Sequence, residues 1–283
     1  MSAKALEGKS ALVSGASNGM GLASARLLAE DGAAVMITGR REDKLIAARD
    51  TLRKQVPGAR FEAMVSDAGK SEDAQAAIDA AKAMTGKLDI IVSAVGRGVY
   101  IPILKCDEQD VLEEFQLSFM TAFFMIRYGA PKLEKHGSIV CVSSTAGGLP
   151  CAGLGPYAAA KAGLEMFVKV AAMELGRAPI RINAVRPGFT RAEGTEFMFE
   201  DPDLLKDFNE FIPMGRAGES EDLARAIRFL AGPESGWVTG QIFAADGGQE
   251  LRGFPDSNYS LDQIYGKDTM DAYRAGDLPP GEA

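Results

Sequence analysis

The sequence predicts an α/β fold: a Rossmann-like, doubly wound parallel sheet of about seven strands with helices on both faces, in a single domain. Short runs rich in Val, Ile and Ala alternate with longer stretches of helical pattern through the first 250 residues. These short runs are continuously apolar, which is typical of parallel strands covered by helices on both faces. A glycine-rich turn stands at the first junction between a strand and a helix, where such folds bind nucleotides.

The strands are predicted from the short apolar runs, which are bounded by turn residues. They lie at 10–14, 34–38, 60–65, 89–92, 138–143, 181–185 and 241–245. The helices are predicted from the stretches between them, where apolar residues recur with helical spacing. They lie near 19–31, 42–55, 71–84, 108–134, 157–176, 203–210 and 220–231. This order of elements predicts successive βαβ units in one sheet.

No composition break marks a second domain, so residues 1–250 are interpreted as one dinucleotide-binding and catalytic domain. Residues 189–216 interrupt the alternation with aromatic, methionine and charged residues, and they are interpreted as a lid over the substrate. A pair of amphipathic helices that packs its own core is the alternative for this segment. Residues 251–283 form a C-terminal tail rich in Gly, Pro and Asp. The tail is compatible with packing over a pocket of its own chain, with packing over a neighbour's pocket, and with disorder.

Bulk composition narrows the classes of partner. The net charge is −8 and the basic residues are scattered, which argues against nucleic acid and anionic membranes as partners. No uninterrupted apolar stretch approaches the length of a membrane span, and the first seven residues form no apolar signal region. We therefore expect a cytoplasmic protein. The three cysteines form no metal-binding pattern and the single histidine, His136, lies in a predicted turn, so no metal site is expected.

The first strand runs into a turn in which glycines stand at 15, 19 and 21, with Ser17, Asn18 and Met20 between them. Glycines permit the tight turn and the close approach of the backbone to a pyrophosphate, which would rest on the N-terminus of the next helix. A generic glycine turn is the alternative. The position of the turn at the first βα junction favours a dinucleotide site.

Tyr157 and Lys161 are four residues apart with only alanines between them, so they share one face of a helix. An ammonium about 4 Å from a phenol in a partly dry site is worth about 4 kcal/mol, which would lower the phenol pKa by roughly three units. Ser144 stands thirteen residues before the tyrosine and would donate to the same substrate oxygen. The same spacing recurs at Tyr128 and Lys132, but with helix-breaking Gly and Pro inside it.

Taken together, these motifs resemble the short-chain dehydrogenase/reductase family over roughly residues 6–250. The resemblance rests on the G-x3-G-x-G turn, on Asp67 after the third strand, on Ser144 with the Tyr-x3-Lys pair, and on the Asn-Ala-Val-Arg-Pro-Gly segment at 183–188. It implies an NAD(P)-dependent oxidoreductase of CH–OH and C=O groups that forms a homodimer or a homotetramer. It also implies that Tyr157 exchanges a proton with the substrate, that Lys161 lowers the phenol pKa and holds the nicotinamide ribose, and that Ser144 polarises the carbonyl.

The resemblance also assigns the cofactor-binding residues. They are Gly15, Ser17, Asn18, Gly19, Met20, Gly21, Arg40, Arg41, Asp67, Ala68, Gly96, Tyr157, Lys161, Pro187, Gly188 and Thr190. Relatives that prefer NAD place an acidic residue at the position of Gly39. Here two guanidiniums follow that glycine instead, which favours NADP(H) and leaves NAD(H) as the other option. Thr190 is a weaker match, because the usual threonine position is occupied by Ala192.

Two departures from the family pattern concern proton transfer. Relatives usually carry Asn-Asn-Ala-Gly after the fourth strand, where this chain has Ser-Ala-Val-Gly at 93–96. Relatives also place an asparagine in the following long helix, where its backbone positions a water that relays protons from the lysine. Ser118 occupies that position, and we include it among the catalytic residues. A serine can still bend a helix or bind a water, so an altered relay is expected, with loss of catalysis as the alternative.

The predicted substrate pocket is bounded by residues 96–100, residues 149–151 and the 189–216 lid. Its apolar content predicts an NADP(H)-preferring oxidoreductase that acts on a ketone or secondary alcohol of a moderately large apolar molecule. The alternatives are a 3-oxoacyl-thioester (acyl-carrier-protein) reductase and a non-catalytic nucleotide-binding sensor. An enoyl reductase is disfavoured, because those relatives space the tyrosine and lysine further apart.

Overall fold

The computed structural model of the chain describes residues 4–192, 195–255 and 258–279. Parts of the predicted lid (193–194) and of the predicted tail (256–257 and 280–283) lie outside the described residues. The described chain forms one parallel sheet in the order β3-β2-β1-β4-β5-β6-β7, which confirms the predicted Rossmann-like fold. The strands are β1 Ser10–Ser14, β2 Ala34–Gly39, β3 Phe61–Val65, β4 Ile90–Ser93, β5 Ser138–Val142, β6 Arg181–Pro187 and β7 Ile242–Ala245.

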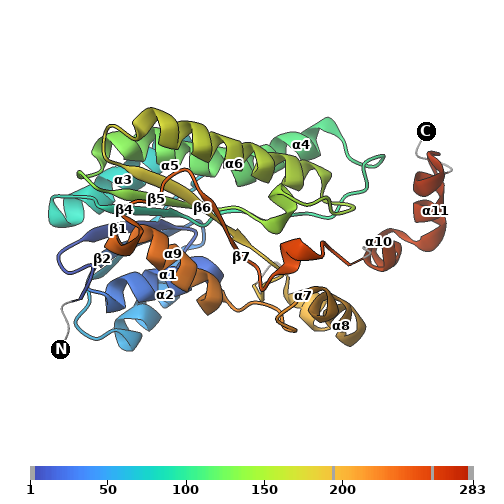
Figure 1. Ribbon diagram of the computed structural model, residues 1–283, viewed down its shortest axis with the longest axis horizontal. Helices are drawn as coiled ribbons and strands as arrows, with labels where there is room; N and C mark the ends of the chain where they lie inside the picture. Colours follow the sequence, from blue (N-terminus) through green and yellow to red (C-terminus); the bar gives the residue numbers. More distant parts are fainter. Residues whose placement is uncertain (1–3, 193–194, 256–257, 280–283) are drawn as a thin grey trace.

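Helices cover both faces of the sheet (Figure 1). On one face lie α1 Gly19–Glu30, α2 Glu42–Gln55 and α9 Ser220–Ala231. On the other lie α3 Ser71–Thr85, α4 Glu108–Phe115, α5 Thr121–Gly129 and α6 Gly155–Leu175. Short 3-10 turns complete the set at η2 Ala130–Lys132, η3 Thr145–Gly147, η4 Pro233–Ser235 and η5 Gln249–Leu251. In the described residues, no helix is long and apolar enough to cross a membrane.

The two faces of the sheet bury separate apolar cores. The core under α1, α2 and α9 includes Val13, Ile37 and Ile227, and the core under α3, α5 and α6 includes Ile91 and Leu164. Strand β1 pairs with β2 on one side and with β4 on the other, so the chain reverses its direction of winding between β1 and β4. In open α/β sheets, ligands bind at the carboxyl ends of the strands beside this switch point.

The predicted helix at 108–134 is helical from Glu108 to Lys132, but it is not regular α-helix throughout. Helix α4 passes into a π-helical turn, η1 Gln116–Met120, before α5 begins. Two hydroxyls bond within this segment: Ser118 donates to Glu114, and Thr121 donates to the carbonyl of Leu117. Side-chain bonds of this kind compete with the regular helical ladder. Pro131, whose ring cannot continue a helix, lies in the closing 3-10 turn.

The segment predicted as a lid contains two helices, α7 Glu196–Phe199 and α8 Pro202–Phe211. Asp201 caps α8 by accepting from the backbone N–H groups of residues 203 and 204. Phe189 stacks on Phe199 and Phe208, with ring centroids 4.8 and 4.1 Å apart. The aromatic residues of this segment therefore pack largely against one another, as the alternative interpretation had it, while some also face the cavity described below.

The tail forms two short helices, α10 Asn258–Tyr265 and α11 Lys267–Ala275, which lie at the end of the molecule beyond α4 (Figure 1). Leu261, Met270 and Tyr273 are buried together, with Tyr100 packed against them. The Tyr265 hydroxyl donates to the Tyr100 carbonyl at 2.6 Å. Of the possibilities left open by the sequence, the described part of the tail thus packs on its own chain.

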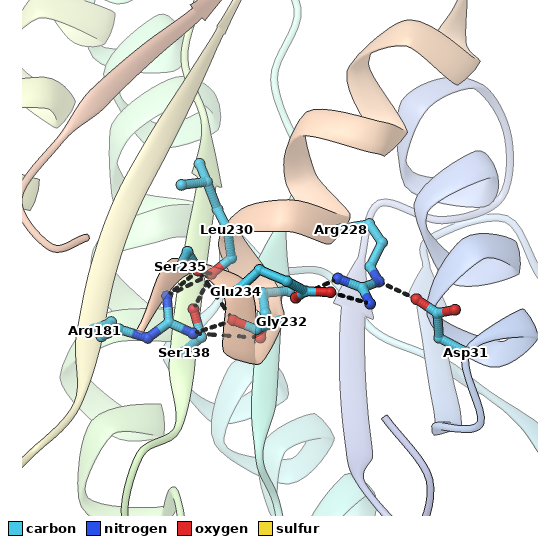
Figure 2. A network of polar contacts seen from close by, with 9 residues as sticks. Asp31, Ser138, Arg181, Arg228, Leu230, Gly232, Glu234 and Ser235 are labelled. Atoms are coloured by element: carbon cyan, nitrogen blue, oxygen red, sulfur yellow. Dashed lines mark hydrogen bonds and ion pairs between the residues drawn. The ribbon is translucent and has the colours of Figure 1, made fainter. Parts of the chain in front are cut away.

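A polar network fastens the C-terminal end of α9 to the start of β6 (Figure 2). Arg181, the first residue of β6, donates to the carbonyls of Leu230 and Gly232 at 2.7 and 3.0 Å and to Ser235 at 2.6 Å. Arg228 pairs with Glu234 at 2.8 Å and with Asp31 at the end of α1. These bonds satisfy carbonyl groups at the C-terminus of α9, which the helix itself leaves unpaired.

Candidate active site

A cavity of about 1250 Å³ opens at the carboxyl ends of the strands, beside the switch point between β1 and β4. All of the predicted cofactor residues except Lys161 line it, and so does Ser144. Lys161 and Ser118 are not in the lining and lie beneath it, with 1% and 0% of their surfaces exposed. The fold thus gathers residues from separate strand ends around one space.

The glycine turn forms the floor of this cavity. Gly15 has φ +79°, which a residue with a side chain rarely adopts. A Cβ on Gly21 would lie 2.3 Å from the carbonyl oxygen of Gly15, so the start of α1 can approach the turn only because position 21 lacks a side chain. In the described chain, the N-cap residue Asn18 makes no side-chain capping bond to α1. The first residues of the helix, Gly19, Met20 and Gly21, line the cavity, so its N-terminus is a site suited to a pyrophosphate.

The far end of the cavity follows the ends of β2 and β3. Arg40 and Arg41 are exposed on its rim, directly after Gly39. Asp67 lies in a turn in which its Oδ1 accepts from the N–H of Gly69 at 3.1 Å. Its own N–H donates to Oδ2 of Asp73 at 2.8 Å. The turn is therefore held by side chains on both sides, and its position suits the adenosine half of a dinucleotide.

Tyr157 and Ser144 meet at the other end. The 3-10 turn η3 follows β5, and Ser144 stands at its N-cap, where its Oγ accepts from the N–H of Ala146 at 3.2 Å. Tyr157 lies in the first turn of α6, directly after Pro156, which fits there because the first N–H groups of a helix have no partner within the helix. Its ring packs against Gly98, where a Cβ would come within 3.1 Å of the ring. Glycine at this position lets the loop after β4 cover the phenol.

Lys161 lies one turn along α6 from Tyr157. Its Nζ lies 5.7 Å from the centre of the tyrosine ring and donates to the carbonyl of Val142 at 2.9 Å. A Cβ on Gly96 would lie 2.7 Å from this nitrogen, so the loop after β4 lies directly over the ammonium. The pair therefore shares a helix face, as the spacing predicts.

The expected lowering of the tyrosine pKa is wrong. Burial raises the pKa of Tyr157 to about 12; the hydrogen bond with Ser144 lowers it, and the carboxylate of Glu114 raises it further. Burial also lowers the pKa of Lys161 to about 8, against the opposing effects of Glu114, Cys141 and Glu165. Loss of hydration disfavours the charged form of each group and is the largest influence on both pKa values. The phenol is thus protonated at neutral pH.

Two buried carboxylates near this pair were not found from the sequence. Glu114 is 7% exposed, and its Oε1 accepts from the Ser118 hydroxyl at 2.5 Å. Glu165 is 5% exposed and accepts from Ser143 at 2.7 Å and from Arg186 at 2.8 Å. The i, i+4 spacing of Glu114 and Ser118 was a visible signal. The burial of the two carboxylates was not visible, because it depends on contacts between segments that are distant in the chain.

Two threonine hydroxyls lie in the segment that follows Gly188. The Thr190 hydroxyl donates to the carbonyl of Gly188 at 2.9 Å. Thr195, which the sequence did not single out, also lines the cavity, beside Ala192. Its hydroxyl donates to the carbonyl of Thr190 at 2.7 Å. Thr195 thus brings a hydroxyl to the region where the usual threonine is replaced by alanine.

Apolar side chains line the cavity on the side of the lid and the tail. They are Phe189, Met198, Phe208, Phe254, Leu154 and Tyr100. The predicted wall at 96–100 contributes to this side, with Arg97 exposed among its residues. Among the described residues, no group of three or more His, Cys, Asp and Glu side chains is arranged to hold a metal ion.

Comparison with known proteins gives consistent matches over most of the chain. The family model described as enoyl-(acyl carrier protein) reductase matches residues 15–250. The glucose 1-dehydrogenase of Gluconobacter oxydans (strain 621H) is 36% identical over 262 residues, which cover 89% of this chain and 96% of that protein.

Solved structures are similar as well. A short-chain type dehydrogenase/reductase from Mycobacterium ulcerans has a TM-score of 0.89 at 30% identity and covers 94% of this chain and 98% of its own. An NADPH-bound short chain oxidoreductase from Pseudomonas aeruginosa PAO1, described as containing an atypical catalytic center, has a TM-score of 0.80 at 32% identity. That match covers 84% of this chain and 96% of the other.

Proposed function

The chain belongs to the short-chain dehydrogenase/reductase family and is thus an NAD(P)-dependent oxidoreductase, and on that premise we propose that it transfers a hydride between NADP(H) and a ketone or secondary alcohol of a moderately large apolar molecule. One observation carries the proposal. A single cavity has the glycine turn and two arginines at one end and Ser144 with Tyr157 at the other, with an apolar wall beside them.

The residues present fit a dinucleotide. The uncapped amides of α1 and the bare backbone at Gly21 would hold the pyrophosphate, and Arg40 with Arg41 would hold a 2′-phosphate. Asp67 would accept from the adenine amino group, and Lys161 would hold the nicotinamide ribose. When bound, the nicotinamide supplies or accepts the hydride. The NADPH-bound neighbour from Pseudomonas aeruginosa supports the choice of NADP(H).

Tyr157 is proposed as the acid/base. Because burial raises its pKa to about 12, the phenol carries its proton at neutral pH and is ready to donate it to a carbonyl oxygen during reduction. Ser144 is proposed to donate a hydrogen bond to the same oxygen and to stabilise the charge that develops there. The ammonium of Lys161 would stabilise the phenolate left behind and favour its reprotonation.

The substrate is proposed to be apolar because the remaining wall offers it mainly aromatic and aliphatic surface. Phe189, Met198 and Phe208 belong to the cluster formed by the 189–216 segment, and Phe254 lies near the start of the tail. Tyr100 is held from behind by Tyr265 of α10. The lid and the tail are thus both proposed to shape the substrate pocket.

Self-association is proposed on separate grounds. Helix α6 exposes Met166, Val170 and Met173, which recur with helical spacing on one face. Exposed apolar stripes of this kind favour packing against another chain. A homodimer or homotetramer is therefore proposed, and sedimentation of the purified protein tests it.

The activity is tested with a panel of ketones, 3-oxoacyl thioesters and both reduced cofactors, by following the loss of nicotinamide absorbance. Wild type is compared with Tyr157→Phe and with Tyr128→Phe, which removes a hydroxyl from the second copy of the same spacing. We expect turnover of an apolar ketone that Tyr157→Phe abolishes and Tyr128→Phe keeps. Preferential turnover of thioesters would favour the carrier-protein reductase instead. If no substrate gives turnover that depends on Tyr157, a nucleotide-binding sensor is favoured.

A further inference from the structure

We propose that the buried carboxylate of Glu114 is the positioning group that keeps Lys161 protonated while Tyr157 works, an inference that rests on the proposed role of that tyrosine. In relatives a neutral asparagine stands at the position of Ser118. Here a hydroxyl and a buried acid together occupy this region.

The geometry holds Glu114 in one place. It lies in the last turn of α4 and is 7% exposed. The Ser118 hydroxyl, four residues on, donates to its Oε1 at 2.5 Å, and the backbone N–H of Val99 donates to the same carboxylate. A carboxylate is buried in a protein only when donors or cations compensate for its lost hydration. Two donors are thus built around it by different segments of the chain.

The cation that faces this carboxylate is Lys161. The point where a Cβ on Gly96 would lie is 2.7 Å from the lysine Nζ and 3.6 Å from the Ser118 Oγ. The ammonium and the hydroxyl that bonds Glu114 therefore both lie close to the same point of this loop. Helix α4 and the π-helical turn both pack on α6, which brings the acid to the lysine.

The other nearby carboxylate is already committed elsewhere. Glu165 stands one turn beyond Lys161 on α6, but Arg186 pairs with both of its oxygens and Ser143 donates to it as well. Glu114 has no such ion pair within 4 Å among the described side chains. Its charge is thus left to act on the lysine.

The remaining ionisable groups fit this assignment. Glu114 is faced by Lys161 and Tyr157 from α6 and by Arg97 from the loop after β4. Arg97 is exposed, so water screens its charge, whereas Lys161 is buried. Burial lowers the pKa of Lys161 to about 8, and Glu114 is the largest influence that raises it again. Without the carboxylate, burial would bring that pKa down toward neutral pH.

The experiment measures the pKa of Lys161 directly. The protein is labelled with 13C-lysine, the Cε resonance of Lys161 is assigned by its absence in Lys161→Arg, and its chemical shift is followed with pH. Glu114→Gln keeps the size of the side chain and removes its charge. A buried pair of unit charges is worth a pKa unit or more, so this variant should lower the pKa of Lys161 by at least about one unit.

Two variants serve as controls. Glu108→Gln removes an exposed charge from the same helix and should leave the pKa of Lys161 unchanged. Glu114→Asp keeps the charge and should restore most of the wild-type value. The proposal is overturned if Lys161 titrates at the same pH in wild type and Glu114→Gln, or if Glu108→Gln shifts it equally.

A measurement on wild type alone guards against misfolding of the Gln variant. Burial raises the pKa of Glu114, so its protonation should appear as a second step in the Lys161 resonance, above the ordinary range for glutamate. Absence of that step also overturns the proposal. Neither readout needs a substrate, so this inference can fail while Tyr157-dependent turnover stands, and the reverse.

Discussion

Replacing Gly21 with alanine tests the geometry of the proposed pyrophosphate site. A Cβ at this position would lie 2.3 Å from the carbonyl oxygen and 2.9 Å from the carbonyl carbon of Gly15, and 3.0 Å from the Cα of Ala16. All three atoms are backbone, so no side chain can rotate away. The backbone of the turn itself must therefore move to make room for the Cβ.

The magnitude follows from two opposing effects. Overpacking of this kind costs about 1–3 kcal/mol. Alanine is favoured over glycine inside a helix by about 1 kcal/mol, which offsets part of that cost. We therefore expect a net loss of up to roughly 2 kcal/mol in the free energy of unfolding, or a fall in Tm of up to about 8 °C. Displaced amides should also weaken NADPH binding by about tenfold or more.

The assay is thermal unfolding together with fluorescence titration of NADPH, and Gly163→Ala is the matched control. Gly163 also lies within a helix, α6, but a Cβ there would meet only the Phe119 ring, at 3.7 Å. That variant should be as stable as wild type or slightly more so, with an unchanged Kd. If Gly21→Ala behaves like Gly163→Ala in both measurements, the close-approach argument is refuted.

Three further predictions concern other parts of the molecule. Replacing Arg40 and Arg41 together with alanine should raise the Kd for NADPH on the order of a hundredfold and the Kd for NADH by less than about threefold, both measured by fluorescence. An equal loss of affinity for the two cofactors would rule out the 2′-phosphate assignment. The pKa of Lys161 is about 8 in the folded protein and 10.5 ordinarily, so between these values the unfolded chain binds more protons and stability rises with pH. The unfolding free energy of wild type, measured in urea relative to Lys161→Met, should thus increase by about 2 kcal/mol from pH 8 to pH 10, and a flat difference would contradict the buried charge. Arg228→Ala should lower the unfolding free energy in urea by about 1 kcal/mol, because the Arg228 side chain is 15% exposed and paired with two acids. Arg225→Ala, on the same helix and 74% exposed, should lower it by less than about 0.5 kcal/mol. Equal losses would show that the network is not stabilising.

The fold and many of the residues that line the cavity were predictable, because their sequence signals are local. A strand of a covered parallel sheet is apolar throughout, and a glycine turn at a strand end marks the place where a helix begins close by. The spacing of Tyr157 and Lys161 likewise needs only the helical repeat. These features depend on residues that are near one another in the chain.

The rest depends on contacts between distant segments. Glu114 is buried where α4 packs on α6, and the spacing with Ser118 does not reveal that packing. The tyrosine pKa was mispredicted for the same reason, since burial of the phenol raises it and the carboxylate of Glu114 raises it further. The position of α10 against Tyr100 follows from packing that a Gly- and Pro-rich sequence does not encode by periodicity.

The most direct test of the central claim follows the hydride itself. NADPH deuterated at the nicotinamide C4 is incubated with an accepted ketone, and the alcohol product is analysed by mass spectrometry. With the label on one of the two faces of C4, we expect wild type and Tyr128→Phe to form an alcohol that carries one deuterium on its carbinol carbon. Tyr157→Phe should form no alcohol. An alcohol without deuterium from wild type, whichever face of C4 carries the label, or unchanged label transfer by Tyr157→Phe, would contradict the central claim.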